Sequence, residues 1–236
     1  MTEKITRQMV LDAAKISQEI IDKGLSGEYA HGPKNEEYKR LKQIKEYKDT
    51  YNKMSPNVMM KRILKTYQTS HGILDNYEVT GHPYRGNVIN SYEWACITPE
   101  TSGPKPRHLV LPQLYILINS KGIRFGSVYG ENVEPSSPFV YAVSKNPTLQ
   151  KKIYDVLKTK NNNICLWDGG EMSGEDLPTD ETKKQIKEWS DVGRVWRKTI
   201  RLIGYFYKKD VPNDIHDRII STLDFLLPIY KSISTA

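Results

Sequence analysis

The chain has 236 residues, of which 38% are hydrophobic and 27% charged, with a formal net charge of +7 and a mean hydropathy of −0.61. These values fit one sizeable globular domain, with or without an appendage, and no apolar run reaches the roughly 18 residues of a membrane span. Because the start of the chain lacks an apolar signal sequence, and its two cysteines are too few for a disulfide framework or a zinc site, we expect a cytoplasmic protein.

The first 75 residues predict a helical region. Apolar residues recur at helical spacing in 6–23 and 55–69, and a basic helix with a narrow apolar stripe is indicated over 35–53. Ten basic and four acidic residues fall between positions 34 and 65. The lysines of this segment either form a solvated helix face or contact a DNA backbone, and both interpretations stay open.

The run from Tyr77 to Val128 carries most of the strand signal. Residues 109–118 form a nearly continuous apolar run, and Lys121-Gly122 indicates a tight turn into a strand with period-two alternation. We therefore predict a β-hairpin at this point. Cys96 lies within an apolar strand of the same run, which predicts an inert core thiol.

The rest of the chain contains both helices and strands. Apolar residues at a period of 3.6 indicate the helices, and apolar residues at a period of 2 indicate the strands. The predicted elements are helices over 147–158, 179–189 and 212–233, a short strand over 164–167, and one or two strands over 195–207. We predict an α+β fold, in which a mixed or antiparallel sheet is flanked by helices. An N-terminal helical extension, residues 1–75, precedes the sheet-containing domain, residues 76–236.

Sequence motifs of common enzyme classes are absent, which argues against catalysis. The chain has no GxxxxGK(S/T) phosphate loop, no HExxH zinc motif and no GxSxG nucleophile elbow. Four carboxylates near a glycine-bearing loop could bind Mg²⁺: Asp168, Glu171, Glu175 and Asp176. We expect no catalytic residue, metal or cofactor, and we keep a small Mg²⁺-dependent nuclease built on this loop as an alternative.

Aromatic and basic residues are abundant and often adjacent. The chain has 15 Tyr, 4 Trp and 4 Phe, and both Tyr84-Arg85 and Trp196-Arg197-Lys198 join the two kinds. Aromatic faces stack on exposed bases while Lys and Arg hold phosphates, so this combination favours a nucleic-acid binder. The alternative for each single aromatic residue is ordinary core packing.

Three pieces of the sequence occur in an order that resembles a known family. They are GNVINSYEWACI, which contains Trp94; VLPQLYILI, with the strand IRFGSVYG after a short turn; and a closing series of a helix after Asn146, a basic-aromatic strand pair and the helix DIHDRIISTLDFLLPIYKSI. Together they resemble the N-terminal DNA-binding domain of McrB, the methylcytosine-dependent restriction subunit, over roughly Tyr77 to Ile233. Residues 1–75 have no counterpart in that family, and the spacing from glycine to tryptophan is one residue longer here.

The resemblance implies a non-catalytic domain that binds duplex DNA and rotates a methylated or hydroxymethylated cytosine out of the stack into an aromatic pocket. Carried over by position, it assigns base-pocket roles to Trp94, Tyr115 and Leu111, DNA-insertion roles to Tyr84, Arg85 and Asn87, and phosphate-binding roles to Arg197, Lys198 and Arg201. For Trp94, the alternative is plain core packing.

The resemblance also implies partners. They are double-stranded DNA with modified cytosine, and an AAA+ GTPase motor and a nuclease subunit of a modification-dependent restriction system. GTP hydrolysis and DNA cleavage would then belong to other domains or subunits, and no membrane partner is expected. Besides the nuclease, two functions stay open: a sequence-nonspecific nucleic-acid binder without a base pocket, and an interaction module whose basic helix docks an acidic protein.

Overall fold

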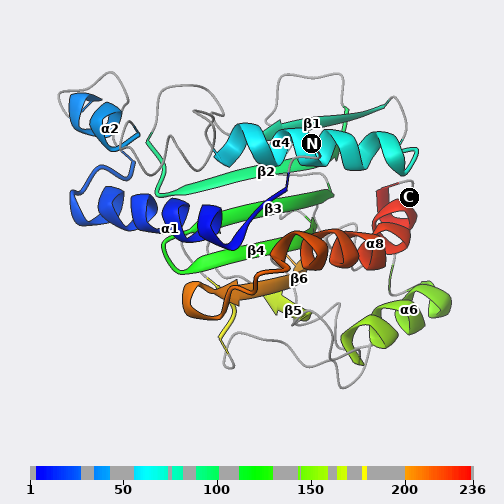
Figure 1. Cartoon of the computed structure of the whole chain (residues 1–236). Coiled ribbons are helices and arrows are strands. Elements are labelled where there is room, and N and C mark those ends of the chain that lie inside the picture. The colour runs from blue at the N-terminus through cyan, green and yellow to red at the C-terminus, as the bar shows by residue number, and fades with distance from the viewer. Residues whose placement is uncertain are drawn as a thin grey trace.

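Six strands form one antiparallel sheet in the order β1-β2-β3-β4-β6-β5, as the computed structural model shows (Figure 1). The residues that the structure describes are 4–27, 35–42, 56–73, 76–81, 89–100, 112–129, 143, 145–158, 164–168, 177–179 and 200–234. The strands are β1 (Tyr77–Gly81), β2 (Tyr92–Pro99), β3 (Gln113–Asn119), β4 (Gly122–Tyr129), β5 (Cys165–Asp168) and β6 (Ile200–Tyr207). The helices are α1 (Arg7–Asp22), α2 (Asn35–Lys42), α4 (Pro56–Ser70), α6 (Pro147–Lys158) and α8 (Ile215–Ser234), with a 3-10 turn η3 (Lys208–Asp210). The predicted α+β class is confirmed.

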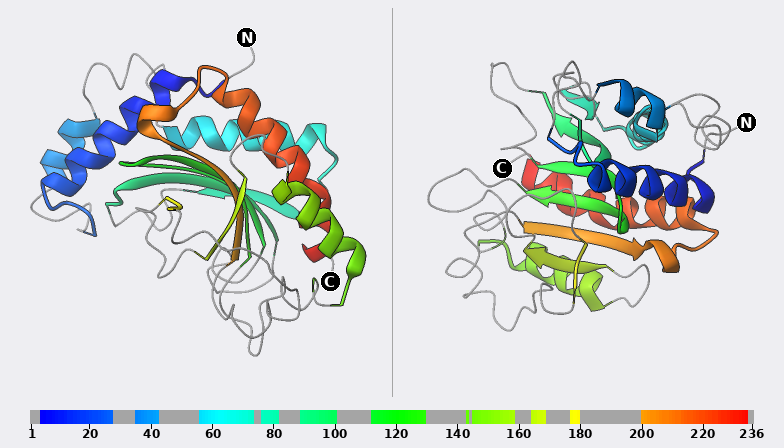
Figure 2. Two further views of the ribbon diagram at one scale, coloured as in Figure 1. Left: turned by 90° about the horizontal axis from the view of Figure 1, so that it is seen from below. Right: turned by 90° about the vertical axis from the view of Figure 1, so that its left-hand side faces the viewer.

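Helices α1, α4 and α8 form one layer over one face of the sheet (Figures 1 and 2). Helix α1 packs mainly on β3 and β4, α4 on β1 and β2, and α8 on β3, β4 and β6. Their apolar residues share one core with strand residues such as Ile97, Ile116 and Phe125. Helices from the first 75 residues thus lie in the same core as the sheet, while the predicted domain boundary at residue 75 stays a prediction.

The first helix starts where its sequence predicts. The Thr6 hydroxyl accepts a hydrogen bond from the Met9 backbone N–H at 3.2 Å, and the Met9 sulfur accepts one from the Thr6 N–H at 3.4 Å. This reciprocal cap satisfies two backbone donors that an open helix end would leave unpaired. The apolar residues that follow at helical spacing are buried: Met9, Val10, Ala13, Ile16 and Ile20.

The predicted hairpin joins β3 to β4. The Asn119 side-chain oxygen accepts hydrogen bonds from the backbone N–H groups of Lys121 and Gly122, both at 3.0 Å, which closes the turn. Gly122 has a φ of 152°, and a Cβ at this position would meet the backbone oxygen of Phe206 on the neighbouring strand. The turn at Lys121-Gly122 is therefore confirmed, and packing against β6 requires a glycine there.

Other sequence predictions are confirmed in part. The strand expected at 164–167 is β5, the helix expected at 147–158 is α6, and the strand expected at 195–207 is described from Ile200 onward as β6. The helix predicted over 179–189 lies outside the described residues except for Thr179, and the basic helix is described only to Lys42. Within the described ranges, no helix is long and apolar enough to cross a membrane.

Candidate functional site

The face of the sheet opposite the helix layer carries a separate cluster of buried side chains. Side chains alternate between the two faces along each strand, so the residues between those of the helix-covered core point to this second face. We call the group the second-face cluster, and it consists of Trp94, Cys96, Tyr115, Leu117, Trp167 and Ile203. Four strands, β2, β3, β5 and β6, contribute to it.

Trp94 and Tyr115, two of the three residues assigned to a base pocket, lie close together in this cluster. They sit on adjacent antiparallel strands, where Tyr115 pairs with Cys96 and Trp94 pairs with Leu117. Diagonal neighbours on the same face of two adjacent strands are close enough for aromatic side chains to touch. Trp94 is 8% exposed and Tyr115 is 5% exposed, so both are buried in the unbound chain.

Two buried arginines complete the second face. Arg124 of β4 and Arg201 of β6 are 4% and 5% exposed. Each guanidinium carbon lies 4.9 Å from the ring centre of Trp167 on β5, a distance at which cation and ring attract. Arg201 pairs directly with Trp167, whereas Arg124 lies two strands away and reaches the indole across β6. Arg201, predicted as a phosphate ligand, is thus part of this face.

Gly126 lies at the centre of the same face. It pairs with Tyr115 on one side and with Ile203 on the other, so no side chain stands between these two residues. A Cβ at Gly126 would meet the backbone oxygen of Leu202 on β6, so the close approach of that strand requires a glycine here.

Two polar atoms of the cluster are buried without a hydrogen-bond partner among the described residues. They are the Tyr115 hydroxyl oxygen and the Trp167 indole nitrogen. Burial raises the pKa of Tyr115, partly offset by the positive charges of Arg124 and Arg201, so the hydroxyl keeps its proton at neutral pH. An unsatisfied buried donor costs about 1–3 kcal/mol, so each atom is a place where a ligand oxygen would stabilise the complex.

On the helix-covered side, three further polar atoms are buried without a hydrogen-bond partner in the described part of the chain. They are the Asn57 carbonyl oxygen, the Ser127 hydroxyl and the Thr222 hydroxyl. Asn57, on α4, also donates a hydrogen bond of 2.9 Å to the backbone oxygen of Trp94. The helix layer thus holds the strand segment that presents Trp94.

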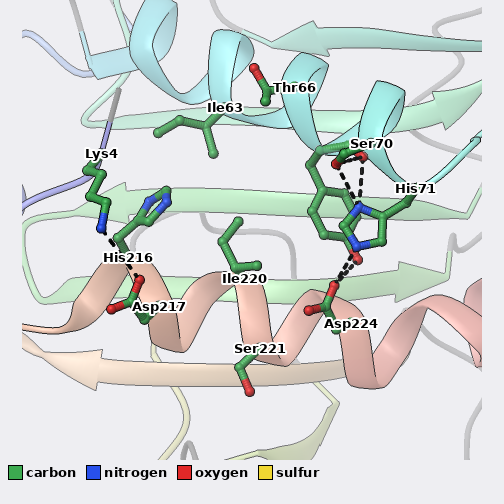
Figure 3. Close-up of a pocket in the computed structure, with 11 residues that line it drawn as sticks. Lys4, Ile63, Thr66, Ser70, His71, His216, Asp217, Ile220, Ser221 and Asp224 are labelled. Atoms are coloured by element: carbon green, nitrogen blue, oxygen red, sulfur yellow. Dashed lines mark hydrogen bonds and ion pairs between the residues drawn. The ribbon is translucent and has the colours of Figure 1, made fainter. Parts of the chain in front are cut away.

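A hollow of about 800 Å³ lies between α4 and α8 in the helix layer (Figure 3). The ion pair Lys4–Asp217, at 4.0 Å, stands at one end, and a contact of 3.0 Å between His71 Nε2 and the Asp224 carboxylate stands at the other. Ile220 of α8 lies between them in the middle of the hollow. It is separate from the second-face cluster, and none of the predicted site residues line it.

His71 lies between Ser70 and Asp224 in this hollow: its Nδ1 is 3.0 Å from the Ser70 oxygen and its Nε2 is 3.0 Å from Asp224, a set of residues that also makes up a serine hydrolase triad. However, the Ser70 hydroxyl donates its one proton to the Tyr67 carbonyl at 3.1 Å. The His71 Nδ1 faces that carbonyl and the Ser70 oxygen, both at 3.0 Å, so it is placed to donate a proton rather than to take one from the serine. The contacts fix the end of α4 and do not activate a nucleophile.

Several predicted site residues lie outside the described part of the chain. They are Tyr84, Arg85, Asn87, Leu111, Arg197 and Lys198 of the DNA-reader assignment, and Glu171, Glu175 and Asp176 of the alternative Mg²⁺ site. Among the residues that are described, no group of three or more His, Cys, Asp or Glu side chains could hold a metal ion.

Trp167 and Arg124 were missed by the sequence assignment. For Arg124 a signal existed, because a charged residue stands in an otherwise apolar strand whose alternation places it beside Gly126. For Trp167 the sequence indicated a short strand but not the strand with which it pairs. The partner strand of β5 is β6, which begins more than 30 residues later in the chain.

Comparison of the chain with protein-family models, with curated proteins and with solved structures finds no match.

Proposed function

We propose that the chain is a non-catalytic reader of duplex DNA. A modified cytosine rotates out of the double helix and binds against the second-face cluster. In this proposal the chain is the specificity module of a cytoplasmic restriction system directed at modified DNA. Cleavage and GTP hydrolysis belong to partner subunits or to other domains.

One observation carries the proposal. Trp94 and Tyr115, which the sequence resemblance assigns to the base pocket, lie on one face of one sheet, together with a third aromatic ring and two arginines. Stacking of a base on an aromatic ring contributes about 1–3 kcal/mol, and buried donors can read the edge of the base. The face therefore offers both kinds of contact that a flipped cytosine needs.

Burial of this face has a consequence for binding. Because Trp94 and Tyr115 are at most 8% exposed, a base reaches them only after part of the surrounding chain moves. Binding is therefore coupled to a conformational change, whose free energy reduces the affinity for every duplex alike. Discrimination between duplexes depends on contacts made after opening.

A binding titration at fixed moderate salt tests the proposal. It uses three otherwise identical duplexes with cytosine, 5-methylcytosine or 5-hydroxymethylcytosine at one position, and the wild type is compared with Trp94→Ala. We expect at least one modified duplex to bind more tightly than the unmodified one, and we expect Trp94→Ala to reduce this preference by about tenfold or more, because a stacking surface is lost.

The matched control is Tyr154→Ala, since Tyr154 is an aromatic residue on α6 that is 43% exposed and lies outside the cluster. It should keep the full preference. If Trp94→Ala does not fold, as its melting curve would show, Trp94→Phe takes its place. Equal binding of all three duplexes by the wild type would contradict the proposal and would favour a nonspecific nucleic-acid binder.

A further inference from the structure

We infer that the second-face cluster selects a cytosine whose 5-substituent carries an oxygen acceptor, such as hydroxymethyl, over one with a methyl group. The inference rests on the proposed function and names the modification that the same site reads.

The two buried polar groups of the second-face cluster that lack a partner among the described residues can each donate a hydrogen bond. The Trp167 indole nitrogen can only donate, and the Tyr115 hydroxyl, protonated at neutral pH, has a proton to donate. Both residues are more than nine-tenths buried, at 2% and 5% exposure, and neither polar atom has a partner among the described residues. The guanidinium groups of Arg124 and Arg201 beside them are also donors only.

The two donors reach a bound base from different sides. Tyr115 is on β3 and Trp167 on β5, with β4 and β6 between them, so their backbones are about 14 Å apart at ordinary strand spacing. A cytosine ring placed between the two side chains presents O2 on one side and C5 on the other, because C5 lies across the ring from C2. One donor can therefore meet O2, which every cytosine has, while the other meets the substituent on C5.

A methyl group cannot accept a hydrogen bond, so 5-methylcytosine leaves the donor on the C5 side buried and unpaired. The oxygen of a hydroxymethyl group has lone pairs and can satisfy that donor. A site built around a buried hydrogen bond rejects an analogue that lacks the partner atom, because the penalty falls on the protein group. We expect 5-hydroxymethylcytosine to bind about tenfold more tightly than 5-methylcytosine.

The experiment compares wild type, Tyr115→Phe and Trp167→Phe on duplexes with cytosine, 5-methylcytosine and 5-hydroxymethylcytosine. Both substitutions keep an aromatic ring and remove one donor. The variant that has lost the donor beside C5 should bind the 5-methylcytosine and 5-hydroxymethylcytosine duplexes equally tightly. The other variant should weaken both to a similar extent and keep the preference for hydroxymethyl.

The outcomes distinguish a failure of this inference from a failure of the proposed function. Equal and tight binding of both modified duplexes by the wild type would overturn this inference and leave the proposed function standing. A hydroxymethyl preference that survives in both variants would also overturn it. If the wild type prefers neither modified duplex to the unmodified one, the proposed function fails together with the inference. Melting curves of the variants show whether each is folded, and the wild-type comparison is decisive without them.

Discussion

At the scale of single residues, His216 links the start of α8 to the segment before α1. Its Nδ1 accepts a hydrogen bond from the Ile5 backbone N–H at 3.4 Å, which requires that nitrogen to be unprotonated. Burial lowers the pKa of His216 below its usual value, Asp217 partly opposes the change, and Lys4 adds to it. The folded chain therefore favours the neutral imidazole.

This state of His216 predicts a pH dependence of stability. Since its pKa is lower in the folded than in the unfolded chain, the unfolded chain binds the proton more readily once the pH falls below about 6.5, and folding loses free energy there. We expect the free energy of unfolding of the wild type to fall more between pH 8 and pH 5 than that of His216→Gln. Urea denaturation at both pH values measures this, and an equal fall in the two proteins would contradict the assignment.

At the scale of elements, the contact between α4 and β2 connects the helix layer to the candidate site. Asn57 is 2% exposed and donates to the backbone oxygen of Trp94. A buried side chain that bonds to a strand backbone holds that strand against the helix, because breaking the bond leaves a buried polar group unpaired. Asn57 is thus a positioning residue for Trp94.

Removal of this side chain should destabilise the fold. We expect Asn57→Ala to lower the free energy of unfolding by about 1–3 kcal/mol, through the lost hydrogen bond and the unpaired carbonyl. Val58→Ala, at the next position of α4 and 38% exposed, is the control and should change stability by less than about 0.5 kcal/mol. Similar losses in both variants, measured by chemical denaturation, would show that Asn57 has no special role in holding β2.

Elements with local determinants could be predicted from the sequence, and so could the hairpin, but the pairing of strands that lie far apart in the chain could not. The Thr6 cap and the turn at Lys121-Gly122 depend on residues a few positions apart, and both are found where expected. The position of β6 between β4 and β5 depends on contacts between segments that are distant in the chain. The hydrophobic pattern of a strand does not indicate which distant strand it pairs with.

The candidate site could likewise be predicted only in part. Trp94 and Tyr115 came from the order of three sequence pieces, and their common face follows from the pairing of β2 with β3. Trp167 and Arg124 join them only through the order of the other strands. The resemblance therefore indicated Trp94, Tyr115 and Arg201, while Trp167 and Arg124 became visible only in the fold.

The whole molecule combines a basic chain with a sheet whose two faces differ. One face is covered by α1, α4 and α8 and holds the main core. The other holds aromatic rings and two arginines, together with the Tyr115 hydroxyl and the Trp167 indole nitrogen, which are buried without a hydrogen-bond partner among the described residues. A net charge of +7 favours binding to a polyanion such as DNA. We propose that a modified cytosine leaves the double helix and binds to the second face.

Fluorescence of 2-aminopurine placed next to the modified cytosine tests this claim most directly, because the probe brightens when its neighbour leaves the stack. With wild type and a 5-hydroxymethylcytosine duplex, the account predicts a saturable rise in fluorescence that follows binding measured by anisotropy. The unmodified duplex should show no such rise at equal occupancy, and Trp94→Phe should reduce it. Full binding of the modified duplex without any change in 2-aminopurine fluorescence would contradict the account.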